Sequence, residues 1–159
     1  NRLASDGFKI VLTNNILESN SILYLCSKEK VAELDPDFYK RFNDLKNIEI
    51  SGFAYSEFST KNYVIDMSLI FINSEDSIDT QESTILEEIT QSLGLGFDSN
   101  RYPSSVFYQK KYEKEIEINE YSRLDKDIVR LLYSSKMKPG LDSTEVKRVI
   151  KKILKLEKN

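Results

Sequence analysis

The segment from residue 87 to residue 97 gathers the side chains best suited to chemistry. Its sequence is Glu-Glu-Ile-Thr-Gln-Ser-Leu-Gly-Leu-Gly-Phe, which places Glu87 and Gln91 at the i,i+4 spacing of helical neighbours. At about 100° per residue, Glu88 lies about 100° from Glu87, and an apolar stripe with Ile89 and Leu93 lies on the opposite side. The pattern predicts an amphipathic helix whose polar face carries two carboxyl groups and one amide.

The spacing of this segment resembles the active-site helix of the metzincin zinc proteases, whose signature holds three histidine ligands, a general-base glutamate and a turn glycine. Glu88 stands at the position of the base and Gly94 at that of the glycine, while the ligand positions hold Glu87, Gln91 and Phe97. The chain has no histidine and one cysteine. Since a catalytic zinc needs three protein ligands, we predict no metal site and no other cofactor.

Three later segments extend the resemblance. In residues 102–108, Phe107 stands where matrix metalloproteases carry the methionine of their Met-turn, and residues 121–133 are similar to the closing helix of those enzymes. The chain is most similar to a bacterial family of unknown function that contains many predicted lipoproteins. Its hallmark blocks correspond to Glu87–Leu95, Ser105–Phe107, Val129–Tyr133 and Pro139–Leu141.

This resemblance implies a zincin-like fold with a small mixed sheet. It also implies a location outside the cytoplasm, in the bacterial envelope, with a lipid anchor possible before residue 1.

Composition agrees with one folded domain over residues 1–159. The chain is 40% hydrophobic and 11% aromatic, which argues against disorder. Its net charge of −3 has interspersed signs, so we expect no nucleic-acid partner. No apolar run approaches the roughly 18 residues of a membrane span.

Apolar periodicity and turn residues predict the order of the elements. We expect strands over residues 8–12, 21–26, 48–55 and 63–72. We expect helices ending near residue 34 and over residues 36–45, 82–95, 122–134 and from 142 onward, the last two opened by capping boxes. Because strands mostly precede helices, the fold class is α+β, with about three or four helices.

The predicted function is non-catalytic binding of a peptide or protein. Its proposed site combines Glu87, Glu88 and Gln91 with two aromatic residues of the neighbouring segment, Tyr102 and Tyr108. In the alternative interpretations, the polar face is simply solvated and the tyrosines cover the core. An enzyme also remains open: a divergent hydrolase with Glu88 as general base, atypical metal ligands and a second carboxylate from a residue such as Asp98 or Asp125.

Three residues receive structural roles in this prediction. Gly94 ends the motif helix, because glycine adopts the backbone conformation that stops a helix. We expect Phe97 or Phe107 to project toward the helix and fill the space that a metal site leaves, since protein interiors contain few voids.

The last predicted helix has a basic face with Lys147, Arg148, Lys151, Lys152, Lys155 and Lys158 opposite apolar residues. Such a helix can lie on anionic lipid or bind an acidic partner. Alternatively, it packs its apolar side on the domain and solvates its lysines.

Overall fold

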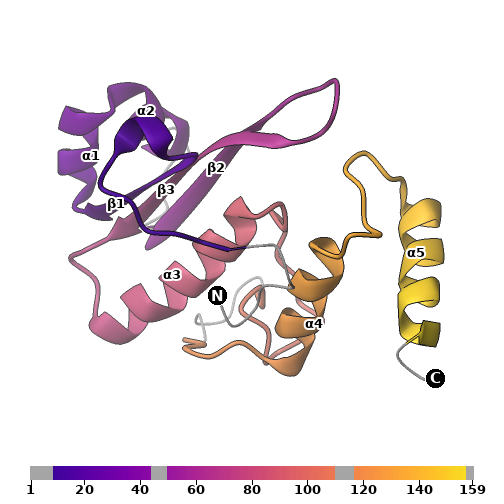
Figure 1. Cartoon of the computed structure of the whole chain (residues 1–159). Helices are drawn as coiled ribbons and strands as arrows, with labels where there is room; N and C mark the ends of the chain where they lie inside the picture. Colours follow the sequence, from indigo (N-terminus) through magenta and orange to yellow (C-terminus); the bar gives the residue numbers. More distant parts are fainter. Residues whose placement is uncertain (1–8, 44–49, 110–116, 157–159) are drawn as a thin grey trace.

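The sheet is small and mixed (Figure 1). The computed structural model describes residues 9–43, 50–109 and 117–156. Within these residues, three strands pair in the order β1-β3-β2: β1 (Ser21–Cys26), β2 (Gly52–Phe58) and β3 (Ile65–Asn73). β1 runs parallel to β3, whereas β2 runs antiparallel to it. The predicted α+β class and mixed sheet are confirmed.

The described part of the chain contains five α-helices, where about three or four were expected. They are α1 (Lys28–Leu34), α2 (Pro36–Asn43), α3 (Ile78–Ser92), α4 (Arg123–Leu132) and α5 (Ser143–Leu156). A single 3-10 turn, η1 (Ile16–Glu18), precedes β1. None of the helices in the described ranges is both long enough and apolar enough to cross a bilayer.

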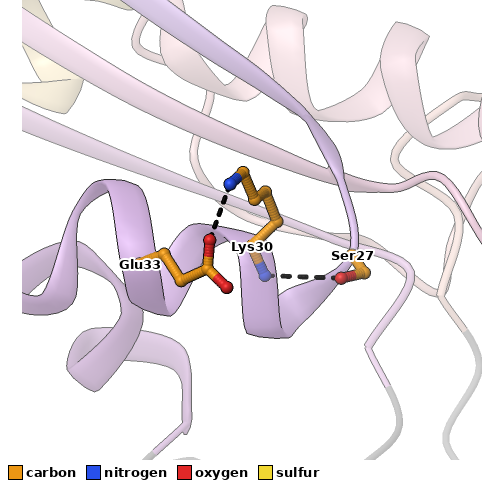
Figure 2. Close-up of polar contacts among 3 residues, drawn as sticks. All are labelled: Ser27, Lys30 and Glu33. Carbon is orange, nitrogen blue, oxygen red and sulfur yellow. Dashed lines mark hydrogen bonds and ion pairs between the residues drawn. The ribbon is translucent and has the colours of Figure 1, made fainter.

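Local capping explains where α1 and α2 begin. The Ser27 hydroxyl accepts a hydrogen bond from the Lys30 amide at 3.3 Å, and Lys30 also pairs with Glu33 across one turn (Figure 2). The Asp35 carboxylate accepts from the Phe38 amide at 2.9 Å, directly before the proline at the first position of α2. Since the ion pair is exposed, capping and packing carry most of the local stability.

The main apolar core lies between one face of the sheet and the helices α1 and α2. Val31, Phe38, Phe42 and Phe71 are almost fully buried there. The rings of Phe42 and Phe71 stack with centroids 4.8 Å apart. The opposite face of the sheet carries α3 (Figure 1), so the sheet fixes the position of the motif helix.

Three of the predicted elements differ in the structure. The segment Lys9–Leu12 is not assigned as a strand, and Val11 and Leu12 are mostly exposed. The helix α3 begins at Ile78 rather than Glu82, because the Ser77 hydroxyl accepts from the Thr80 amide and starts the helix earlier. β2 is also displaced toward the C-terminus relative to the predicted strand over 48–55. Residues 8, 44–49 and 158 of the predicted segments lie outside the described residues.

Candidate functional site

Small residues on the sheet bring α3 close to β2. A Cβ atom added to Gly52 would lie 2.3 Å from Cγ2 of Thr84 and 2.9 Å from Cγ of Glu88. Further along, the Ser56 and Ser68 hydroxyls lie 2.8 Å apart, and the Ser68 hydroxyl donates to the Ser92 carbonyl. Glycine and serine at these positions therefore let the helix rest directly on the strands.

Glu88 is buried at this contact. Only 7% of the residue is exposed, and its Oε2 atom has no hydrogen-bond partner among the described residues. Burial, together with the negative charge of Asp98, raises the pKa of Glu88 to about 8, although a hydrogen bond from the Ala54 backbone opposes the shift. The carboxyl group is therefore mostly protonated at neutral pH. Its expected place on an open polar face beside Glu87 is wrong, because the sheet covers this side of α3.

Gln91 joins two carboxylates on the outer side of α3. Its Nε2 donates to Oε1 of Glu87 at 3.2 Å and to Oδ1 of Asp98 at 3.0 Å. The first contact confirms the hydrogen bond expected from the i,i+4 spacing. The second brings Asp98 to the motif helix, a long-range contact that no local sequence signal indicated.

The two phenylalanines that were expected to fill the space of a metal site, Phe97 and Phe107, differ in their burial. Phe97 is 93% exposed, so its expected structural role is wrong: the chain turns outward directly after Gly94 (φ +105°) and Gly96. Phe107 is buried, with 6% exposed. Tyr102 is exposed and Tyr108 half-buried.

Asp125 fixes the Phe107 segment to the start of α4. This carboxylate has no exposed surface, and it accepts hydrogen bonds from the Ser105 hydroxyl at 2.5 Å, the Val106 amide at 3.3 Å and the Ser122 amide at 2.8 Å. The capping box predicted from Ser122 and Asp125 is confirmed. The hydrogen bonds of Asp125 with Ser105 and Val106 were not predicted, because a capping pattern indicates only contacts within the helix.

Two tyrosines hold the C-terminal half of α3. The Tyr121 hydroxyl lies 2.9 Å from the Thr90 hydroxyl and donates to the Leu86 carbonyl, while the Tyr133 hydroxyl donates to the Leu93 carbonyl at 3.0 Å. Burial raises the pKa of both tyrosines above the ordinary value. The contact with Leu93 gives a partner to a carbonyl at the C-terminal end of α3, where the helix itself supplies none.

An open cleft of about 1250 Å³ lies at the C-terminal end of α3. One wall is formed by Gln91 and the residues that follow it, and another by the sheet, including Ala54, Ser56 and Phe58 of β2. The N-terminal segment from Lys9 to Ile16, the strands β1 and β3, the β2–β3 turn and the segment after α4 contribute the rest of the lining. Of the residues predicted to bind a partner, Gln91 belongs to this lining, whereas Glu87, Glu88, Tyr102 and Tyr108 are not part of it.

One contact ties the β2–β3 turn to the segment after α4. A Cβ atom at Gly140 would lie 2.7 Å from Cδ2 of Tyr63, so the tyrosine ring sits against this glycine. Both residues have a left-handed backbone, with φ +57° at Tyr63 and φ +82° at Gly140. An unfavourable conformation of a bulky residue needs support from its surroundings, and the close approach to Gly140 supplies it.

The residues of the cleft can make hydrogen bonds and apolar contacts. Across the described ranges, no group of three or more His, Cys, Asp or Glu residues is placed to hold a metal ion. The polar groups of the lining are the amides of Asn14, Asn20 and Gln91, several hydroxyls and the ammonium groups of Lys9 and Lys138, and much of the remaining wall is apolar. Such a site can hold a partner by surface burial and hydrogen bonds.

Fold and site thus define an α+β domain with a partly apolar cleft beside its third helix. The chain belongs to a family described as a protein of unknown function (DUF2927), whose model matches residues 1–152. This confirms the predicted membership of a family of unknown function. Comparisons with curated proteins and with solved structures gave no match.

Proposed function

We propose that this domain is a non-catalytic binding module that holds an extended segment of a peptide or protein in the cleft at the end of α3. The observation that carries the proposal is the open cleft of about 1250 Å³ with Gln91 in its wall. This volume exceeds that of typical small-molecule sites, which reach about 1000 Å³. A long, partly apolar opening suits a chain segment better than a small metabolite.

The position of β2 supports an extended ligand. It is an antiparallel edge strand of the described sheet, and Ala54, Ser56 and Phe58, at alternate positions, line the cleft from one face of that sheet. Edge strands carry backbone donors and acceptors on their open side, and a peptide can add to them as a further strand. The metzincin resemblance implies the same mode, since those enzymes bind substrate beside an edge strand.

The proposal also covers the evolutionary origin of the domain and its location in the cell. In this view the domain descends from a zinc protease that lost its histidine ligands, and it works in the bacterial envelope as part of a lipoprotein. Support comes from the order of the four sequence blocks and from their contacts. The Asp125 carboxylate joins the start of the presumed closing helix to the segment that replaces the Met-turn.

A divergent hydrolase that uses Glu88 is the alternative. The raised pKa of this buried carboxyl, about 8, favours it, because strongly shifted groups are frequent at catalytic sites. The geometry opposes it, since Glu88 is 7% exposed and does not line the cleft. A general base must come within hydrogen-bond reach of its substrate, and Gly52 and Ala54 occupy that space.

Two exposed phenylalanines provide a matched test of the cleft. Phe58 lines it and is 58% exposed, whereas Phe97 is 93% exposed and lies outside the lining. Purified protein is screened against an array of extended peptides, and the best binder is titrated by fluorescence anisotropy. We expect Phe58→Ala to weaken binding about fivefold or more, the effect of losing roughly 1 kcal/mol of apolar contact.

Phe97→Ala is the control and should bind as wild type does. Equal loss in both variants, or loss in Phe97→Ala alone, would place the binding surface elsewhere. Peptide hydrolysis that disappears in Glu88→Gln, with unchanged melting temperature, would instead support the hydrolase.

A further inference from the structure

The C-terminal helix α5 separates apolar and basic side chains with little mixing. At about 100° per residue, its apolar residues span an arc of about 140°, and its cations occupy the opposite side. The apolar set contains Val146, Val149, Ile150, Ile153 and Leu154, and the basic set contains Lys147, Arg148, Lys151, Lys152 and Lys155. All five cations are exposed.

The basic face of α5 is exposed, and its apolar face is half-buried apart from the exposed Leu154. Figure 1 shows it at the outer edge of the molecule, beyond α4 and away from the sheet. None of its described residues is fully buried, and Leu154 is 46% exposed. The apolar face is thus only partly covered by the rest of the protein. A helix with this pattern normally buries its apolar side against another surface.

Charge is unequally distributed between α5 and the remainder of the chain. Five cations and one carboxylate, Glu145, give the helix a net charge of +4, which leaves −7 for the remainder of a chain whose net charge is −3. A negatively charged surface would attract the helix and repel the rest of the protein. This asymmetry selects one orientation of docking.

We propose that α5 is a docking surface for an anionic lipid bilayer. In the docked state, the apolar residues enter the boundary between headgroups and acyl chains, and the lysines lie at the level of the lipid phosphates. An acidic protein would pair with the basic face but would leave the apolar arc uncovered. A bilayer interface satisfies both faces at once, and it lies outside the cleft, so peptide binding and lipid binding can occur together.

The test uses the intact chain and vesicles of phosphatidylcholine, with or without phosphatidylglycerol. We expect the protein to sediment with the anionic vesicles and to stay in solution with the neutral ones. High salt should release the protein from the vesicles, because salt screens the attraction between the lysine charges and the lipid phosphates beyond a few ångströms. Immobilised polyglutamate serves as the acidic-protein probe in parallel.

Two triple variants with the same change in net charge test which part of the protein contacts the membrane. Lys151→Glu/Lys152→Glu/Lys155→Glu should lower the partition coefficient at least about tenfold. The control, Lys40→Glu/Lys61→Glu/Lys126→Glu, changes three exposed lysines outside α5 and should lose much less. Melting curves verify that both variants fold.

A third variant, Leu154→Asp, adds a charge to the apolar arc and should reduce binding although its overall charge change is small. Three results would overturn the proposal. They are wild-type protein that does not bind anionic vesicles, a control variant that loses as much binding as the α5 variant, or Leu154→Asp protein that binds as well as wild type. Binding to polyglutamate without binding to vesicles would identify an acidic protein as the partner instead.

Discussion

Replacement of Gly52 by alanine tests how closely α3 rests on the sheet. The new Cβ atom would lie 2.3 Å from Cγ2 of Thr84 and 2.9 Å from Cγ of Glu88. Both distances are shorter than an ordinary carbon–carbon contact of about 3.5 Å. Thr84 is 8% exposed and its hydroxyl donates to the Thr80 carbonyl, so its methyl group has little room to move. The helix must shift away from β2.

The expected loss follows from two opposing effects. Overpacking a fitted contact costs about 1–3 kcal/mol, while replacing a glycine within a strand gains about 0.5–1 kcal/mol. The central values of these ranges leave a net destabilisation of about 1–2 kcal/mol for Gly52→Ala. At about 2–4 °C per kcal/mol for a chain of this size, the melting temperature should fall by about 2–8 °C. Thermal unfolding and urea titration measure both quantities.

Two further variants make the test specific. Gly96→Ala is the control, because its Cβ would meet no atom within 4 Å, and its melting temperature should stay close to that of wild type. Adding Thr84→Ser to Gly52→Ala removes the closest methyl group and keeps the hydroxyl, so it should recover more than half of the loss. A Gly52→Ala protein that melts at or above the wild-type temperature would refute the close contact. Failure of Thr84→Ser to restore stability would refute the assignment of the clash to Thr84.

Three other outcomes are expected. Phe107→Ala should cost about 3–5 kcal/mol because the ring is buried, whereas Phe97→Ala should stay within about 0.5 kcal/mol, and urea unfolding distinguishes them. The folded-state pKa of Glu88 is about 8 and exceeds its ordinary value of 4.5. The wild-type protein should therefore lose stability relative to Glu88→Gln as pH rises between these two values. A stability difference that stays constant from about pH 5 to about pH 9 would contradict the burial of Glu88. After dialysis, metal analysis should find less than about a tenth of a zinc ion per chain; about one per chain would favour the hydrolase.

Short-range signals in the sequence predicted most helix starts. Asp35 before a proline, Ser122 with Asp125, and Asp142 with Glu145 all mark helix N-termini in the structure. Each signal depends on atoms within four residues, so the chain around it determines the outcome. The i,i+4 hydrogen bond between Glu87 and Gln91 was predictable for the same reason.

Long-range contacts were not predictable in this way. Helical geometry gave the angle of Glu88 around α3 but not which side the sheet would cover, and that side depends on a glycine 36 residues earlier, Gly52. The environment of Asp98 likewise depends on how the chain turns after Gly94. The segment at Lys9–Leu12 has the composition of a strand, yet it is not assigned as one.

The residues that carried the family resemblance act mainly by position. Tyr133 binds the last turn of α3, Asp125 holds the Ser105–Phe107 segment, and Gly140 receives the ring of Tyr63 beside the cleft. Each contact joins one sequence block to an element that bounds the cleft or supports α3, and none requires a metal. On the proposed descent from a zinc protease, such a framework would persist after the loss of the metal ligands. On the proposed binding function, selectivity for a partner would come from exposed side chains on the walls of the cleft, such as Phe58, because the buried contacts have no free surface to offer.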